Sequence, residues 1–265
     1  MSGAAPRFIA NETKRKLRNG ELTLGFGVSH LRTGATALLA EASGHDWLFL
    51  DMEHGAFSIQ EVTQICIAAL PTGVTPLVRV CAGALDEGTR AVDGGAQGIL
   101  MPHVDRVEQA RQLADAFRFP PRGSRSWGEA QILYRYRLPD HAEAQAAIND
   151  EILIVALIES TEGVANSAAI AAVEGIDVLL IGISDLAAEM GIPGQIAHPR
   201  VVDAIETVST ACRSAGKVFG LGGVYDSENA RRYLGMGARF VLSGYDHFYL
   251  LAGARARSEI LRAAL

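Results

Sequence analysis

Aromatic residues and positive charge are both scarce in this sequence. Phe, Trp and Tyr make up 6% of the 265 residues, and 24 lysines and arginines face 30 aspartates and glutamates, for a net charge of −6. A surface that binds nucleic acid usually combines a basic patch with stacking rings. An acidic chain with few rings therefore gives no indication of binding to nucleic acid or to an anionic membrane.

Long apolar runs and cysteine pairs are also missing. No stretch of about 18 uninterrupted apolar residues predicts a transmembrane helix, and the N-terminal segment has no apolar region typical of a secretory signal. The three cysteines, Cys66, Cys81 and Cys212, are widely spaced and form no CxxC pair. An odd number of isolated thiols favours a reducing compartment, so we expect a cytoplasmic protein.

What the chain does contain is a repeated apolar pattern. Its composition, 49% apolar and 20% charged, is that of a globular protein long enough to bury a large core. Short runs rich in Val, Ile, Leu and Phe are typical of strands buried on both faces of a parallel sheet. The eight expected strands are Leu22–Val28, Trp47–Met52, Pro76–Val80, Gly98–Met101, Ile152–Ile158, Val178–Ile183, Lys217–Leu221 and Phe240–Leu242.

Apolar residues at three- and four-residue spacing between these runs predict helices. Examples are Ile59–Leu70, Val104–Phe117, Val201–Ala215, Glu228–Met236 and a final helix over Phe248–Leu265. Eight strand–helix repeats are the pattern of a (β/α)8 barrel, so we expect residues 1–265 to form one such domain. An open doubly wound sheet is the alternative, but GFGVSH after the first strand is not GxGxxG and no Walker sequence occurs.

One long excursion interrupts the alternation, at about residues 119–150. It opens with PPRGSRSWG and continues with a partly helical pattern. Segments of this length inside a compact domain are usually lids or interface elements, so we expect it to contribute to function.

Chemically active residues follow the predicted strands, where barrels of this kind build their active sites. They are Asp51, Glu53, His54, Arg79, Glu159 and Asp185. Glu159 and Asp185 offer hard oxygen ligands that suit Mg²⁺ or Mn²⁺, although helix capping is an equally open role for both. The remaining histidines, including His103, are interpreted as structural or solvated.

His54 and Arg79 have the residue types needed for proton transfer and anion binding. An imidazole titrates near neutral pH and can act as a base. An arginine at a barrel mouth is costly unless it meets an anion, which could be a carboxylate or enolate of the substrate. An internal salt bridge with Asp51 or Glu53 is the alternative.

Lysine is rarer still and excludes one mechanism. Only Lys14, Lys16 and Lys217 occur, the first two in a predicted N-terminal helix and the third at the start of a predicted strand. A Schiff-base aldolase needs a lysine at the carboxyl end of a strand, and none is expected there. Carbanion chemistry at this site would therefore need a metal to accept the developing charge.

At these residues the sequence resembles the class II, metal-dependent pyruvate aldolases of the hydroxy-oxo-acid aldolase and citrate lyase β-chain group. The resemblance spans roughly residues 22–250, and the D-x-E-H pattern favours the aldolases. Among these, the chain is similar to the 2,4-dihydroxyhept-2-ene-1,7-dioate and 2-dehydro-3-deoxyglucarate aldolases. The matching stretches are WLFLDMEHGAFS, PLVRV, GGAQGILMPHVD, PPRGSRSWG, ALIESTEGVAN, VLLIGISDLAAEMG and GMGARFVLSGYD.

The resemblance implies a role for each matching residue. Glu159 and Asp185 would bind Mg²⁺, Mn²⁺ or Co²⁺, and His54, with Asp51 close by, would be the base. Arg79 would bind the pyruvate carbonyl oxygen, and the backbone around Ser184 and Asp185 the pyruvate carboxylate. Asp93 would approach the site from a neighbouring subunit, and an ordinary acid at the end of a helix is the equally open alternative. The last helix would be exchanged between subunits of a homohexamer, a trimer of dimers.

The pocket for the second substrate, an aldehyde, is implied less directly. Trp127 aligns near this pocket, and Gly222, Gly223 and Val224 could line it. Arg122 and Arg125 would bind a distal carboxylate or hydroxyls, or anchor their loop.

Three positions depart from the family pattern. Leu157 stands where relatives often have Gln, Val80 where they often have Pro, and Ser184 lies in a segment that often reads GPAD. Leu157 removes a polar neighbour of the metal site, so we expect this position to affect substrate affinity or metal preference.

The implied reaction is reversible cleavage of a 4-hydroxy-2-oxo acid to pyruvate, or a related 2-oxo acid, and an aldehyde. Oxaloacetate decarboxylation through the same enolate and thioester cleavage of the citrate lyase β-chain type are the alternatives. A barrel without catalytic activity would show no metal-dependent turnover.

Overall fold

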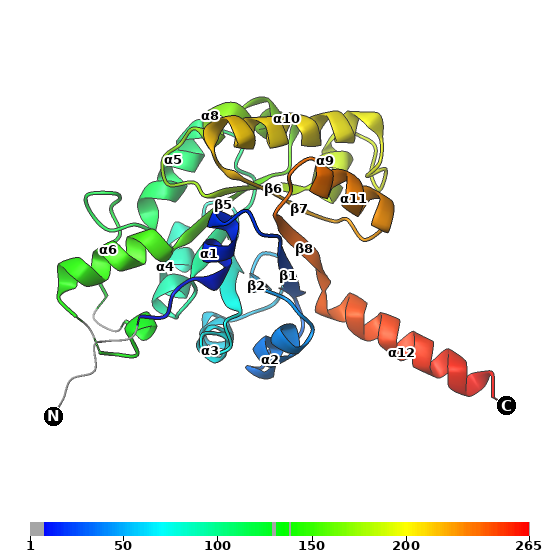
Figure 1. Ribbon diagram of the computed structural model, residues 1–265, viewed down its shortest axis with the longest axis horizontal. Coiled ribbons are helices and arrows are strands. Elements are labelled where there is room, and N and C mark those ends of the chain that lie inside the picture. The colour runs from blue at the N-terminus through cyan, green and yellow to red at the C-terminus, as the bar shows by residue number, and fades with distance from the viewer. Residues whose placement is uncertain (1–7, 129–130, 138, 265) are drawn as a thin grey trace.

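A closed barrel of eight parallel strands forms the centre of the protein (Figure 1). The computed structural model describes residues 8–128, 131–137 and 139–264. The strands pair in chain order and β8 closes on β1, which confirms the predicted (β/α)8 fold. They are β1 Thr23–Val28, β2 Trp47–Asp51, β3 Thr75–Arg79, β4 Gly98–Met101, β5 Leu153–Ile158, β6 Val178–Gly182, β7 Val218–Gly222 and β8 Phe240–Tyr245.

Helices join the strands and cover most of the outside of the barrel. They are α1 Glu12–Arg18, α2 Ala35–Ala42, α3 Ile59–Ala69, α4 Leu85–Asp93, α5 Val107–Ala116, the 3₁₀ turn η1 Ile132–Tyr134, α6 His141–Glu151, α7 Thr161–Ala165, α8 Ser167–Ala171, α9 Ile183–Glu189, α10 Pro199–Ala215, α11 Ser227–Gly235 and α12 Asp246–Arg262. The last corresponds to the predicted Phe248–Leu265, of which Leu265 lies outside the described residues.

Large side chains fill the interior of the barrel. Trp47 and Phe240 stack with ring centroids 3.9 Å apart, and both are fully buried. A Cβ atom at Gly25 would lie 2.4 Å from the Trp47 ring, so the indole needs a glycine on the neighbouring strand. The filled interior leaves space for a ligand only at the ends of the strands.

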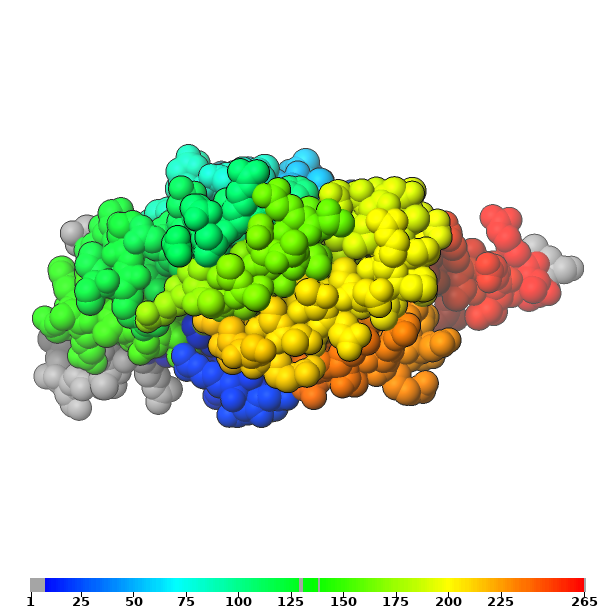
Figure 2. Space-filling view, turned by 90° about the horizontal axis from the view of Figure 1, so that it is seen from above, coloured from blue at the N-terminus to red at the C-terminus, as the bar shows by residue number. Residues whose placement is uncertain are grey.

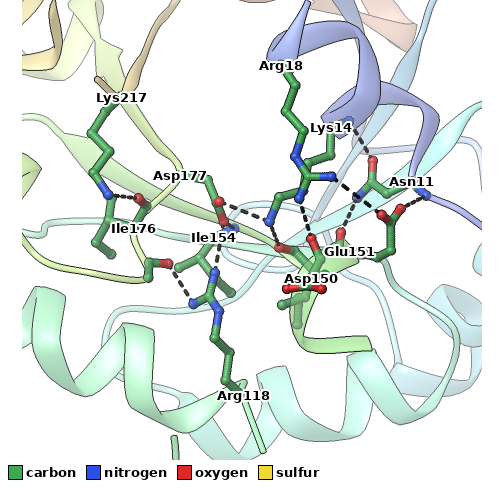
Figure 3. A network of polar contacts seen from close by, with 12 residues as sticks. Asn11, Lys14, Arg18, Arg118, Asp150, Glu151, Ile154, Ile176, Asp177 and Lys217 are labelled. Atoms are coloured by element: carbon green, nitrogen blue, oxygen red, sulfur yellow. Dashed lines mark hydrogen bonds and ion pairs between the residues drawn. The ribbon is translucent and has the colours of Figure 1, made fainter. Parts of the chain in front are cut away.

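A network of charged residues holds the amino end of the barrel together (Figure 3). Asp177 pairs with Lys14 Nζ at 3.0 Å and with Arg118 Nη2 at 3.1 Å, while Lys217 Nζ donates to the carbonyl of Ile176 at 2.8 Å. Burial lowers the pKa of Lys14, and the charge of Asp177 opposes this effect. Lys16 pairs with Asp46 just before β2, so all three lysines lie at this end.

The excursion between α5 and β5 lies at the same end of the barrel. A helix in this fold runs back from the carboxyl ends of the strands, so the segment that follows α5 starts at the amino end. Its apolar side chains form a separate cluster that includes Phe119, Leu133, Tyr134 and Ile148.

The last helix, α12, projects away from the barrel as an arm (Figures 1 and 2). Asp246, its first residue, is the one buried residue of the helix, whereas Phe248, Leu250 and Leu251 are exposed. Beside β1, β7, β8 and α11 lies a mostly apolar cavity of about 380 Å³, here named the α11 groove. It is lined by Leu22, Leu24, Leu221, Val224, Ala230 and Val241, among others.

Within the described ranges, no helix has the length and hydropathy needed to cross a membrane.

Candidate active site

A cavity of about 220 Å³, here named the active-site cavity, opens at the carboxyl ends of the strands. Polar residues that follow or end β2, β3, β5 and β6 meet in it. The predicted residues that line it are His54, Arg79, Glu159, Ser184, Asp185 and Gly222.

Two carboxylates hold the guanidinium of Arg79. Asp51 accepts from Nε at 3.0 Å and from Nη2 at 2.7 Å, and Glu53 Oε2 lies 3.0 Å from Nη1. The predicted alternative of an internal salt bridge is therefore present, with both partners at once. The hydrogen bonds to Asp51 use two of the five N–H groups of the guanidinium, and Glu53 adds an ion pair at Nη1.

Arg79 remains charged despite its burial. Burial would lower its pKa, but the hydrogen bonds and charge of Asp51, together with Glu53, outweigh this effect and raise the pKa. The guanidinium also lies over the Phe49 ring, 5.0 Å from its centroid. The active-site cavity thus contains a fixed cation that suits an anionic ligand.

His54 is the most accessible of the predicted site residues. Its side chain is 70% exposed, and Nε2 lies 3.9 Å from Glu53 Oε2. Asp51 lies beside it as expected, but the link runs through the main chain: the His54 N–H donates to Asp51 Oδ1 at 3.2 Å. The imidazole is therefore free to meet a substrate.

Glu159 and Asp185 bring two carboxylates to neighbouring strand ends. Glu159 directly follows β5 and is 4% exposed, and Asp185 lies in the first turn of α9 directly after β6. Burial raises the pKa of Glu159, and the negative charge of Asp185 raises it further. The main-chain N–H and the charge of His103, together with the charge of Arg79, act in the opposite direction and lower this pKa. Two carboxylates that repel each other beside a cavity are the donor set for a hard divalent cation.

The surroundings of Glu159 support this interpretation. The His103 N–H donates to Oε2 at 3.0 Å. A Cβ atom at Gly182 would lie 2.8 Å from Oε1, so glycine leaves room for that oxygen. In the part of the chain that the structure describes, no group of three or more His, Cys, Asp or Glu is arranged to hold a metal. A metal at this site would therefore take its other ligands from water and substrate.

Glu53 and His103 belong to the site although the sequence analysis gave neither a catalytic role. The His103 ring lies 3.5 Å from Glu159 Oε2 and 3.8 Å from Glu53 Oε1. Its backbone has φ 52°, a region that residues other than glycine rarely adopt. The sequence could have indicated His103 through its position after β4, because Arg79 was chosen for a similar position at the end of β3.

Asp93 and Trp127 do not line the active-site cavity of their own chain. Asp93 ends α4 and accepts from Arg125 Nη2 at 2.6 Å. Trp127 packs against Phe119 and His141, with centroids 5.3 and 5.1 Å away. Within one chain Trp127 lies away from the active-site cavity, because the excursion starts at the opposite end of the barrel. Its predicted place near the aldehyde pocket stays a prediction.

The two arginines of the excursion act as anchors. Arg122 Nη1 pairs with Asp150 at 2.5 Å, and Arg125, which is 4% exposed, pairs with Asp93. The alternative in which they bind a distal carboxylate is not supported within one chain.

Comparison with known proteins shows the family to which the chain belongs. The family model for HpcH/HpaI aldolase/citrate lyase matches residues 31–252. A 4-hydroxy-4-methyl-2-oxoglutarate aldolase of Hapsidospora irregularis is 36% identical over 250 residues, 92% of each chain. A 2-keto-3-deoxy-L-rhamnonate aldolase of Escherichia coli is 37% identical over 238 residues, 90% of this chain and 88% of the other.

A solved structure agrees with both relatives. The HpcH/HpaI aldolase from Desulfitobacterium hafniense superposes with a TM-score of 0.89 at 28% identity and covers 94% of this chain and 96% of its own. Both the sequence matches and this fold extend over the strand ends that carry the site. The chain therefore belongs to the HpcH/HpaI aldolase/citrate lyase family, and it is an aldolase, a carbon–carbon lyase.

Proposed function

We propose that the chain reversibly cleaves a 4-hydroxy-2-oxo acid to pyruvate, or a related 2-oxo acid, and an aldehyde. One observation carries the proposal: a pair of carboxylates, a fixed cation and an accessible imidazole line the same cavity. The two relatives are named for 4-hydroxy-4-methyl-2-oxoglutarate and 2-keto-3-deoxy-L-rhamnonate, both 4-hydroxy-2-oxo acids. Their names support this substrate class.

Glu159 and Asp185 would hold the divalent cation, Mg²⁺, Mn²⁺ or Co²⁺. The cation would supply positive charge beside the keto oxygen when an enolate develops. Arg79 would donate N–H groups that Asp51 does not accept to the same oxygen. The main chain at Ser184 and Asp185 would hold the carboxylate of pyruvate, which fixes the direction of the 2-oxo acid in the cavity.

His54 would move the proton. In the cleavage direction its neutral imidazole accepts the proton of the 4-hydroxyl group. As the C3–C4 bond breaks, its electrons form the C2=C3 double bond and the π electrons of the keto group move to its oxygen, which gives the enolate of pyruvate. The electrons of the former O–H bond form the C=O bond of the aldehyde that is released. Protonation at C3 then gives pyruvate, and addition to an aldehyde is the reverse sequence.

Proton exchange of pyruvate in deuterium oxide tests this function without knowledge of the aldehyde. We expect loss of the methyl proton signal with purified enzyme and added Mg²⁺, Mn²⁺ or Co²⁺, read by NMR after an EDTA quench, and none with EDTA-stripped protein. Glu159→Gln should abolish the metal dependence, because it removes the buried ligand charge. Glu162→Gln, whose side chain is 50% exposed and pairs with Arg106 on the surface, is the matched control.

Two results would contradict the proposal. Absence of exchange with every metal would argue against a pyruvate enolate and favour a thioester lyase. Rapid decarboxylation of oxaloacetate without cleavage of any 4-hydroxy-2-oxo acid would favour the decarboxylase.

We further propose that α12 is exchanged between subunits and fills the α11 groove of another copy, within a homohexamer. The exposed apolar residues of α12 and the open apolar groove support this arrangement. In such an assembly Asp93, whose side chain is 41% exposed, and Trp127 would approach the cavity of a neighbouring subunit.

The remaining proposals concern the chain as a whole. Residues 1–265 would form one domain, with the excursion as part of it. The three cysteines are free thiols, which supports a reducing compartment such as the cytoplasm.

A further inference from the structure

We propose that a cavity at the amino end of the barrel, here named the amino-end cavity, binds the phosphate group of a small molecule. Its volume is about 430 Å³, and it lies among α1, the end of α6 and the starts of β5, β6 and β7. Its charged lining residues are Lys14, Arg18, Arg122, Asp150, Asp177 and Lys217. The active-site cavity opens at the other end of the strands, so this inference does not depend on the aldol reaction.

Lys217 is a cation without a carboxylate partner among the described residues. Gly216 ends α10 in the left-handed region, with φ 65°, and the chain enters β7 at Val218, so the lysine stands between a helix and a strand. Its Nζ donates to the main-chain carbonyls of Ile176 at 2.8 Å and Val173 at 3.3 Å. An ammonium group has three N–H donors, so one remains for an anion.

Two further cations reach the cavity from α1 (Figure 3). Lys14 and Arg18 are four residues apart and therefore share one face of the helix. Lys14, which is 7% exposed, lies 3.0 Å from Asp177 Oδ1. Arg18 donates from Nη2 to the carbonyl of Asp150 at 2.8 Å, and its Nη1 lies 3.7 Å from Glu151 Oε1. A guanidinium has five N–H groups, so Arg18 keeps donors for a ligand.

The charges around the cavity leave a surplus of positive charge. Four cations and two carboxylates line it, an excess of two positive charges. Arg118 pairs with Asp177 at 3.1 Å and Glu151 with Arg18 at 3.7 Å, so the charged partners outside the lining add one charge of each sign. The chain as a whole has a net charge of −6. The local surplus therefore favours an anionic ligand at this end of an acidic protein.

The directions of the donors favour phosphate over a carboxylate. Arg18 and Lys217 lie on opposite sides of Asp177 (Figure 3). A phosphate group presents oxygens in several directions, whereas a carboxylate accepts hydrogen bonds close to one plane. Arginine and lysine are also the side chains that usually bind phosphate. The volume is within the range of small-molecule sites, about 300–1,000 Å³, so the cavity has room for the group that carries the phosphate.

The proposed assembly of the chain uses other surfaces. Helix α12, the α11 groove, Asp93 and Trp127 would meet another copy, and none of these described parts lines the amino-end cavity. The contacts of Lys14, Arg18 and Lys217 lie within one chain and do not depend on the number of copies. We therefore expect the assembled protein to bind the ligand.

Isothermal titration calorimetry of the full chain in its assembled form tests the site. The probes are inorganic phosphate, glycerol 3-phosphate and malonate, each at the same ionic strength. We expect one saturable site per chain for the two phosphate compounds. Malonate, a dicarboxylate, should bind at least about tenfold more weakly, because its flat carboxylates meet fewer of the donors.

Two variants at the cavity should weaken binding of the phosphate compounds. Lys217→Met removes the ammonium group but keeps an unbranched side chain, and Kd should rise about ten- to a hundredfold, the size of a hydrogen bond to a charged group. Arg18→Gln changes a side chain that is 55% exposed, and Kd should rise about three- to tenfold. Arg15→Gln is the matched control on the same helix, because Arg15 is also 55% exposed but does not line the cavity, and Kd should stay unchanged.

A further variant, Arg79→Gln, shows which cavity holds the anion. It alters the cation of the active-site cavity and should leave the affinity for phosphate unchanged. Loss of binding in Arg79→Gln, with wild-type affinity in Lys217→Met and Arg18→Gln, would place the anion in the active-site cavity and overturn the proposal.

The remaining outcomes also decide the question. Tighter binding of glycerol 3-phosphate identifies an ester as the source of the phosphate group, and tighter binding of inorganic phosphate identifies the free ion; both support the site. Absence of saturable binding of either compound, or malonate binding as tight as phosphate binding, would overturn the proposal.

Discussion

Charge at the level of single residues determines what the site can bind. Asp51, Glu53, Glu159 and Asp185 bring four carboxylates to a region where Arg79 is the balancing cation. The excess of negative charge favours a divalent cation, while Arg79 stays fixed beside it. Glu53 is central because its carboxylate lies close to Arg79, His54 and His103.

Glu53→Gln should slow metal-dependent proton exchange of pyruvate by about ten- to a hundredfold. The substitution removes a charged partner of Arg79, and hydrogen bonds to charged groups contribute about 1.5–3 kcal/mol. The rate is measured by NMR in deuterium oxide at saturating metal. Glu108→Gln, a surface change on α5 where the side chain is 68% exposed, should keep the wild-type rate. An unchanged rate in Glu53→Gln would remove this residue from the site.

The sequence predicts those site residues that a strand end delivers directly. Arg79 ends β3, Glu159 directly follows β5, and both line the cavity. Glu53 and His103 depend on how the turns after β2 and β4 direct their side chains, including the positive φ of His103. No periodicity in the sequence encodes that direction. The predicted place of Trp127 near the aldehyde pocket stays a prediction, because a resemblance does not say which subunit supplies a residue.

At the level of elements, Asp246 joins the end of the barrel to the start of α12. Its Oδ2 accepts from the N–H groups of His30 at 2.8 Å and Leu31 at 2.7 Å, and Oδ1 accepts from His247 at 2.8 Å. One buried carboxylate thus orders the loop after β1 and the direction in which the arm leaves. Burial would raise its pKa, but these main-chain donors outweigh burial and lower the pKa.

Asp246→Asn should destabilise the fold by about 1–3 kcal/mol, because buried N–H groups lose a charged acceptor. A lowered pKa means that the carboxylate stabilises the native state above its ordinary value of 3.8 and loses this effect as the pH falls below it. The difference in Tm between wild type and variant should therefore be constant from about pH 5 to 8 and shrink towards pH 3. A difference that does not change with pH would contradict the assigned role.

The boundaries of the elements show where the sequence pattern stops being informative. The predicted strand over Phe240–Leu242 continues in the structure to Tyr245. Ser243 and Gly244 end the apolar run, but Ser243 Oγ donates to the carbonyl of Gly25 and keeps the strand in the barrel. Gly244 has φ 151°, and a Cβ atom there would lie 2.8 Å from the Tyr249 hydroxyl. A search for apolar runs finds buried strands but not such polar continuations.

At the level of the whole molecule, the chain has an apolar arm and an uncovered flank. Helix α12 leaves the barrel beside β8 (Figure 1). The α11 groove includes Val241 and Ser243 of the same strand. A typical monomer does not expose a continuous apolar surface of this kind. The two surfaces are complementary in character, which is the basis for the proposed exchange between copies.

A double variant of the arm, Leu250→Asp with Leu251→Asp, should shift the protein from the assembled form to smaller species. These side chains are 57% and 47% exposed in one chain and would be buried in the assembly. Size-exclusion chromatography with light scattering measures the change across micromolar concentrations. Ser258→Asp, which adds charge at a polar position of the same helix, should leave the mass unaltered. A monomeric wild type would contradict the proposed exchange.

The position of the lysines has a practical consequence. Lys14, Lys16 and Lys217 all lie at the amino end of the barrel, and the active-site cavity opens at the carboxyl end. A resin or surface that reacts with lysine side chains would hold the enzyme by the end away from its cavity. Lys14 is buried, but the Lys16 side chain is 34% exposed, and immobilisation through its amine would leave the mouth facing the solution, where substrates can enter.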